Sequence, residues 1–204
     1  EKVLLGQSVP AYIVYRGMLV NTMNLMLRSG SIAEGSFDFL GYGASISTAA
    51  LDVSNDESPT YDVLNAVSDV GRIAENGSAV ATPNFITSMD LSLANNLRER
   101  MAIGTFGLVG VGAGDANISG KLSTYFGNKT LYEKFINNTP SNINLRVGKS
   151  GRANVFSFPN VKFMGGKVNA GARNQDVMCD MDFQALKDTL TGTSFQIDRV
   201  EEYA

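Results

Sequence analysis

The sequence predicts a mainly β fold with one α-helix and one long, glycine-punctuated hairpin. Three observations predict this class: apolar and polar residues alternate along several segments, one segment carries the start signals of a helix, and one long excursion contains glycine at short intervals. A chain of 204 residues is long enough for one large β domain, and we expect a single domain over residues 1–204. Because the chain begins with Glu1 rather than Met, we also expect that further residues lie upstream.

The clearest predicted strand runs from residue 177 to residue 185. Its apolar residues Val177, Cys179, Met181, Phe183 and Ala185 alternate with the polar residues Asp180, Asp182 and Gln184. This period of two is typical of a strand with one buried face and one polar face. The same alternation predicts further strands around residues 89–93, 143–147 and 195–197.

Residues 154–164 predict two strand pieces rather than one. The pieces cover 154–158 and 161–164, and Pro159 interrupts them, as is typical of a sheet edge or a bulge. The pairs Gly165-Gly166 and Thr191-Gly192 predict turns.

One helix is well signalled at residues 130–138. Thr130 and Glu133 match a capping box, in which the threonine caps the first turn and the glutamate lies three residues later. Leu131 and Phe135 would face the sheet, and Asn137-Asn138 would end the helix. A second helical segment from Pro59 to about Val70 is bounded by Gly71, although its Val and Asn content fits a strand nearly as well.

The chain also contains a weak internal repeat, at about residues 17–41 and 86–127. Residues 20–27 align with 86–93, and residues 32–41 align with 118–127 at equal length. Each copy predicts two strands joined by a connecting segment, or excursion, and this segment is far longer in the second copy. Chance similarity between amphipathic strands explains the match as well as a duplicated β unit does.

The long excursion of the second copy begins with polar and basic residues and continues with apolar residues and glycine. A structureless loop of this length inside a compact domain is uncommon unless it is functional. An apolar loop exposed to water favours aggregation. We therefore expect this segment either to fold back on its own domain or to dock on another chain.

Composition excludes several classes of function. The chain has no His and no Trp, which excludes a Ser-His-Asp triad, a Cys-His dyad and His-ligated zinc or haem. The single cysteine, Cys179, allows no intrachain disulfide and is expected in the core. Charged residues are 18% against about 25% in an average soluble domain, which indicates that part of the surface faces other subunits. The formal net charge of −3 argues against a surface that binds phosphates.

No motif predicts catalysis or a cofactor. The spacing of Gly110, Gly112 and Gly114 does not match a dinucleotide-binding loop, and no helix pattern follows it. The acidic segment from Asp52 to Asp62 lacks the glycine and the terminal glutamate of an EF-hand loop, so we interpret it as a solvated loop. We expect no catalytic, cofactor-binding or metal-binding residue, no cofactor and no enzymatic activity.

The order of several segments resembles the tail tube (major tail) protein family of long-tailed, non-contractile bacteriophages. The resemblance covers roughly residues 63–199 and is carried by residues 86–127, 131–139, 156–163, 174–178, 183–188 and 195–199. It implies a tail-tube-type β-barrel or sandwich with a flanking helix, and hexameric rings that stack into a hollow tube for genomic DNA. It also implies assembly in the host cytoplasm, residence in the virion tail, and the tape measure, tail terminator and distal tail proteins as partners. We expect no membrane association, because no apolar run approaches the roughly 20 residues needed to span a bilayer. The inner tube of a secretion system or of a contractile tail, which shares this fold, remains an alternative.

The resemblance further implies that the long hairpin bridges subunits and successive rings. The residues expected to do so are Asn95, Asn96, Arg98, Arg100, Ile103, Gly104, Phe106, Leu108, Val109, Gly110, Val111 and Gly112, with the apolar tip at Leu108–Val111. Asp180 and Asp182 are candidates for the lumen, because a neutral to acidic channel would not hold DNA phosphates. The same alternation also fits a face on the exterior of the tube. The alternative function is a monomeric β-sandwich module that binds carbohydrate or a receptor. Such modules usually present aromatic platforms, often with Trp, which this chain lacks.

Overall fold

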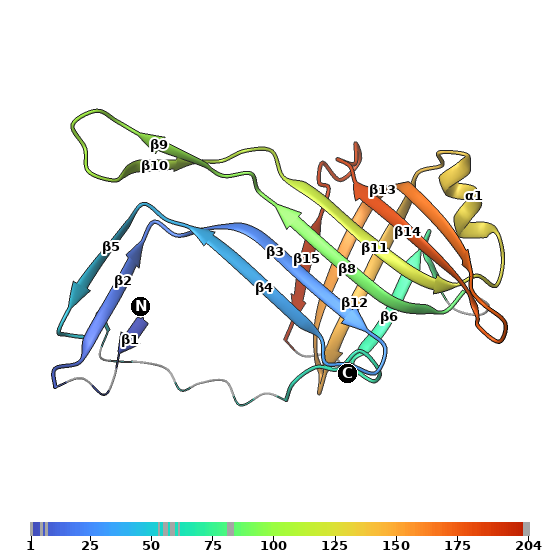
Figure 1. Cartoon of the computed structure of the whole chain (residues 1–204), viewed down its shortest axis with the longest axis horizontal. Coiled ribbons are helices and arrows are strands. Elements are labelled where there is room, and N and C mark those ends of the chain that lie inside the picture. The colour runs from blue at the N-terminus through green and yellow to red at the C-terminus, as the bar shows by residue number, and fades with distance from the viewer. Residues whose placement is uncertain are drawn as a thin grey trace. The chain divides into compact units, whose positions relative to one another are not determined.

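The computed structural model describes residues 2–4, 6, 8–52, 54, 57, 60, 62–80 and 84–201. These residues form a mainly β structure with a single described helix and one long hairpin, which confirms the predicted fold class (Figure 1). The helix is α1 (Thr130–Ile136). The strands are β1 (Lys2–Leu4), β2 (Ala11–Arg16), β3 (Leu19–Arg28), β4 (Glu34–Leu40), β5 (Gly43–Ser47), β6 (Val70–Glu75), β7 (Ser78–Ala79), β8 (Ile86–Ala94), β9 (Arg98–Met101), β10 (Leu108–Gly112), β11 (Asn117–Tyr125), β12 (Ser141–Lys149), β13 (Arg152–Ala170), β14 (Val177–Ala185) and β15 (Gln196–Val200).

The chain divides into two compact units. Unit 1 comprises Glu1–Met23, Phe37–Asp62 and Ala94–Ala116, and unit 2 comprises Asn24–Ser36, Val63–Leu93 and Asn117–Ala204. Unit 1 contains a small antiparallel sheet in the order β1-β2-β5 and the separate β9–β10 hairpin.

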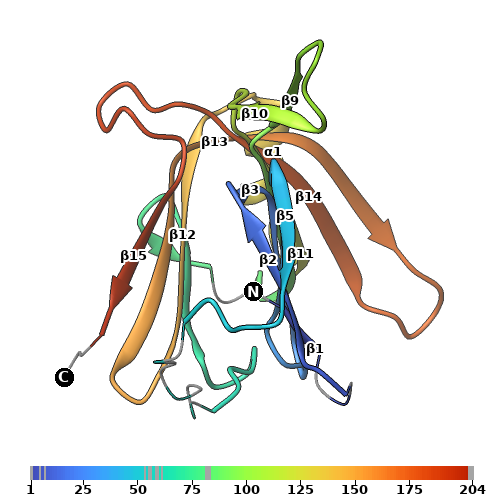
Figure 2. The same ribbon diagram turned by 90° about the vertical axis from the view of Figure 1, so that its left-hand side faces the viewer.

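Unit 2 is built on the large sheet, whose strand order is β4-β3-β8-β11-β14-β13-β12-β6-β7, with β15 paired to β13. Figure 2 shows β12 and β15 on one side of this unit and β11 and β14 on the other, so the sheet folds back on itself. Its core is apolar, and the largest fully buried side chains are Phe158, Phe183, Met89, Ile118, Leu122, Ile143, Leu145, Met181 and Val161. Alternation in the sequence produces this core, because every second residue of a strand points to the same face.

The two copies of the weak repeat lie next to each other in this order. Strands β3 and β8 come from the aligned first halves, and β4 and β11 flank them. The aligned residues Met23 and Met89 are both buried. This arrangement is what a duplicated strand pair would give, and the duplication itself stays a prediction.

Strand predictions were confirmed for β8, β12 and β14, and β14 has the predicted ends. The predicted break at Pro159 was wrong, since β13 runs unbroken through it. The prediction of a bulge fits better: Phe158 pairs with Ile143 and Val161 pairs with Ser141, so the register shifts at the proline. The predicted turn at Gly165-Gly166 was also wrong, because both glycines lie inside β13, where a second bulge falls between Phe163 and Gly165. The turn at Thr191-Gly192 was confirmed by a positive φ at Gly192.

The predicted helix from Pro59 to Val70 does not form in its described part, while Pro59 itself lies outside the described residues. Short polar side chains bond to the backbone of this segment instead. The Oδ1 of Asn65 accepts hydrogen bonds from the N–H groups of Val67 and Ser68, and the Oδ2 of Asp69 accepts one from the N–H of Asn65. Such local bonds compete with a helix and favour a turn, after which β6 begins at Val70.

Helix α1 was predicted correctly in position, but its capping box was not. The N-cap is Lys129 and carries no side-chain cap bond. Asn128, through its Oδ1, accepts a hydrogen bond from the N–H of Thr130 instead. Asn138 has a positive φ just after the helix and ends it, as the sequence predicts.

Candidate functional sites

The β9–β10 hairpin is fixed at its base by polar contacts within unit 1. Asn95 donates from its backbone N–H to the carbonyl of Asn21 and from its Nδ2 to the carbonyl of Val20. Asn96 has a positive φ, and its Nδ2 donates to the carbonyl of Asp115 at 2.8 Å. The guanidinium of Arg98 donates to the carbonyl of Ala113 at 3.0 Å. Of the residues predicted to bridge subunits, Asn96 and Arg98 therefore hold the two arms of the hairpin together, and Asn95 fixes the hairpin to β3.

The end of the hairpin is apolar and fully exposed. Ile103 and Phe106 are each 107% exposed, and Met101 at the end of β9 is also exposed. Gly104 and Gly107 flank these side chains with φ values of 81° and 89°, which residues with a Cβ rarely adopt. The predicted tip at Leu108–Val111 was misplaced, since these residues form β10 and the turn lies at residues 102–107.

The remaining predicted hairpin residues lie on its two strands. Arg100 packs beside Gly112, where a Cβ would come within 3.0 Å of its Nε. Gly110, Val111 and Gly112 pair with Arg100, Glu99 and Arg98 of β9. Val109 is exposed, and Leu108 is half-buried. A β-bulge between Leu108 and Gly110 twists this short ladder.

A second site is the polar face of the unit 2 sheet, opposite the core. Cys179, Met181 and Phe183 point into the core, so Asp180 and Asp182 lie on the other face of β14. The register places Lys121 of β11 opposite Asp182, and Ser123 opposite Asp180. The structure thus brings both predicted aspartates to one polar sheet face, beside residues of β11.

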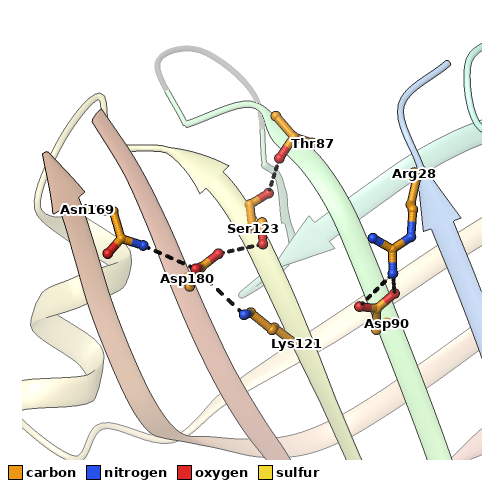
Figure 3. Close-up of polar contacts among 7 residues, drawn as sticks. All are labelled: Arg28, Thr87, Asp90, Lys121, Ser123, Asn169 and Asp180. Atoms are coloured by element: carbon orange, nitrogen blue, oxygen red, sulfur yellow. Dashed lines mark hydrogen bonds and ion pairs between the residues drawn. The ribbon is translucent and has the colours of Figure 1, made fainter. Parts of the chain in front are cut away.

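Asp180 lies at the centre of a polar cluster on this face (Figure 3). Its Oδ1 accepts a hydrogen bond from the Oγ of Ser123 at 2.6 Å, and its Oδ2 accepts one from the Nδ2 of Asn169 at 3.3 Å. The Nζ of Lys121 lies 3.6 Å from the same Oδ2. The carboxylate therefore links β11, β14 and β13 on one side of the sheet.

A second ion pair lies on the same face. The guanidinium of Arg28 on β3 is 3.4 Å from Oδ1 of Asp90 on β8, as Figure 3 shows. A hollow of about 680 Å³ extends over the face from Asn24 and Asp90 to Lys121 and Asp182. The polar face thus continues from β3 to β14.

Charges of both signs lie on this face among the described residues of unit 2. Register places Lys121, Lys162, Lys167, Asp180 and Asp182 on it, and the ion pair of Arg28 with Asp90 adds one further cation and one further anion. Sequence reasoning identified only the two aspartates of β14. The alternation of Lys121 with the buried Leu122 could have predicted that Lys121 lies on the polar face. The pairing of Arg28 with Asp90 could not be predicted, because it depends on β3 and β8 being neighbours in the sheet.

A comparison with protein-family models found a match to the phage tail tube protein family over residues 4–185. The chain belongs to this family. The curated proteins that were compared gave no match.

As a tail tube protein, the chain is a structural component of the virion tail that assembles with itself into a tube and with other tail proteins. The family is a structural one, not an enzyme family. Within the part of the chain that the structure describes, no helix is long and apolar enough to cross a membrane.

The predicted acidic loop has local hydrogen bonds. Asp52 accepts hydrogen bonds from the N–H and the Oγ of Ser54, while Asp56 lies outside the described residues.

Proposed function

We propose that this tail tube protein forms hexameric rings that stack into a hollow tube, through which genomic DNA passes into the host. In this proposal the polar face of the unit 2 sheet lines the channel. The β9–β10 hairpin contacts a neighbouring subunit or ring. The tube is assembled in the host cytoplasm and meets the tape measure, tail terminator and distal tail proteins.

The observation that carries the proposal is the hairpin with its exposed apolar end. Ile103 and Phe106 are fully exposed in the single chain, while polar contacts at the base hold the two arms in place. Burying such side chains contributes about 1.5–3 kcal/mol each. A repeating assembly in which every copy buries both residues therefore gains considerably from this contact.

An open sheet edge supports self-assembly as well. Strand β4 is at one end of the strand order, so one of its edges has no strand partner among the described residues. Nearly all of β4 is exposed, including Phe37 and Phe39. Unpaired edges promote association with other chains, and a ring of identical subunits would cover them.

The polar face suits a channel for DNA because acidic side chains lie beside basic ones on it. A strongly basic wall would bind the DNA phosphates and release counterions, which would slow transit. Family membership favours this proposal over the monomeric carbohydrate- or receptor-binding module considered from the sequence.

Electron microscopy of the purified full chain at high concentration tests the proposal. We expect stacked rings with a central channel. The double variant Ile103→Ser/Phe106→Ser should have the same melting temperature as the wild-type protein but form no long tubes. As a matched control, Val3→Ser/Val9→Ser removes two other exposed apolar side chains of unit 1. Long tubes from the hairpin variant would show that the hairpin does not connect copies, and an unchanged chain that stays monomeric would contradict the function itself.

A further inference from the structure

Two basic side chains of the polar face lie beside a carboxylate on a neighbouring strand. Arg28 is 3.4 Å from Asp90, and Lys121 is 3.6 Å from Asp180. Both pairs are in contact with solvent, with side-chain exposures of 57% and 38% for the first pair and 46% and 28% for the second. A phosphate that approaches Arg28 or Lys121 therefore meets a cation that already has a partner.

Asp182 differs from Asp180 although the two lie on the same face of the same strand. Among the described residues, Asp182 forms no ion pair and no side-chain hydrogen bond. Its Oδ2 points towards Gly165 of β13, where a Cβ would lie 2.8 Å away. Asp180, by contrast, accepts two hydrogen bonds and pairs with Lys121. The chain thus carries two neighbouring carboxylates of equal charge and different contacts.

The hydrogen bonds of Asp180 hold it where it can pair with Lys121. Ser123 and Asn169 donate to its two oxygens from the strands on either side. A carboxylate fixed in this way loses little additional side-chain entropy when it pairs with a cation. The Lys121 ammonium is then held at the sheet rather than extended into the channel.

We infer that Asp90 and Asp180 are positioning residues that mask Arg28 and Lys121, so that these two cations of the polar face do not bind the phosphates of duplex DNA. This inference rests on the proposed function, since it assumes that DNA passes along this face. It differs from simple repulsion by an acidic wall, because basic as well as acidic side chains lie on this face. Each unmasked cation can bind one phosphate and release one counterion.

Masking and repulsion predict different results for the two aspartates of β14. If carboxylates act only through their charge, Asp180→Asn and Asp182→Asn strengthen DNA binding equally. If Asp180 masks Lys121, only Asp180→Asn frees a cation. The two variants have the same net charge and lie two residues apart, so each is the control of the other.

The experiment measures binding of a fluorescent 20-base-pair duplex to the full, unassembled chain by anisotropy at several salt concentrations. Asp180→Asn should bind several-fold more tightly than the unchanged chain at low salt, with a slope of log K against log salt that is steeper by about 0.9. Asp182→Asn should leave the slope unchanged. Asp180→Asn/Lys121→Gln should return the slope to its original value.

Asp90→Asn is an independent test, because it removes the partner of Arg28 in a pair formed by two other strands, β3 and β8. It remains informative if the Asp180 variant does not fold. Equal slopes for Asp180→Asn and Asp182→Asn, with no steeper slope for Asp90→Asn, would overturn the inference. Electron microscopy of the same preparations separates this outcome from a failure of the proposed function. If tubes form and the slopes are equal, only the masking inference is contradicted. If no preparation forms tubes, the proposed function is contradicted.

Discussion

The Nζ of Lys134 on α1 donates a hydrogen bond to Oε1 of Glu75 on β6, and only 17% and 9% of the two side chains are exposed. The Oγ of Ser141 on β12 donates to the same oxygen. This contact fixes the helix to the sheet next to the aromatic contacts of Tyr132 and Phe135. Gly166 of β13 leaves space there, because a Cβ would come within 2.8 Å of Phe135.

Glu75→Gln should destabilise the protein by about 3 kcal/mol, because it leaves the Lys134 ammonium nearly buried without a counter-charge. Urea unfolding followed by circular dichroism measures this change. Glu133→Gln is the control on the same helix, since Glu133 pairs with Lys129 at the surface, 2.7 Å away. The control should leave the free energy of unfolding unchanged. Equal effects of the two variants would show that the buried pair does not fix the helix.

Gly120→Ala should destabilise the protein by about 1–3 kcal/mol through overpacking. A Cβ at Gly120 would lie 2.4 Å from Phe183 and 2.7 Å from the carbonyl oxygen of Asp90, a backbone atom that cannot easily move. Gly43→Ala on β5 is the matched control, because its Cβ would meet no atom within 4 Å. Thermal unfolding compares the two, and a Gly120 variant as stable as the control would mean that β8 and β11 are packed less closely.

The stability of the turn at residues 65–69 should depend on pH through Asp69. The backbone N–H of Asn65 and the hydroxyl of Ser68 hold the pKa of the Asp69 carboxyl below its ordinary value of 3.8. Because the pKa is lowered in the folded state, this contribution is complete above pH 3.8 and is lost as the pH falls through the folded pKa.

Urea unfolding of the unchanged protein and of Asp69→Asn at several pH values checks this sign. The variant should be less stable at pH 6, and the difference should shrink below pH 3.8. A difference that grows on acidification would contradict the assignment of the turn to Asp69.

Cys179 should react slowly with thiol reagents in the folded protein. Burial raises the pKa of its thiol, and the neighbouring Asp180 raises it further, so little thiolate is present at neutral pH. The side chain is also buried in the core of unit 2. Reaction with a chromogenic disulfide should therefore follow unfolding in urea. Rapid reaction of the native chain would mean that β14 opens locally.

Period-two alternation predicted the long strands of unit 2 because one face of each is buried. The bonds of Asn65 and Asp69 with the nearby backbone explain why residues 62–70 are not a helix, although Pro59 and Gly71 resemble helix boundaries. The bulge that takes in Gly165 was missed, since it depends on the register between β13 and β14.

The hairpin was predicted from its length and composition, but its apolar end was placed at Leu108–Val111 instead of at Ile103 and Phe106. The two glycines with positive φ show where the turn lies, and glycine spacing alone does not distinguish a turn from a strand. For the polar face, alternation put Asp180 and Asp182 on one side. Their partners on β11 and β13 follow only from the order of the strands in the sheet, which cannot be read from a single sequence.

The most direct test of the central claim is a cryo-electron microscopy map of the tube formed by the full chain. We predict stacked hexameric rings in which the face carrying Lys121 and Asp180 lines the channel and Ile103 and Phe106 are buried against another copy. A map in which that face points outward, or in which the hairpin ends stay exposed to solvent, would contradict the account.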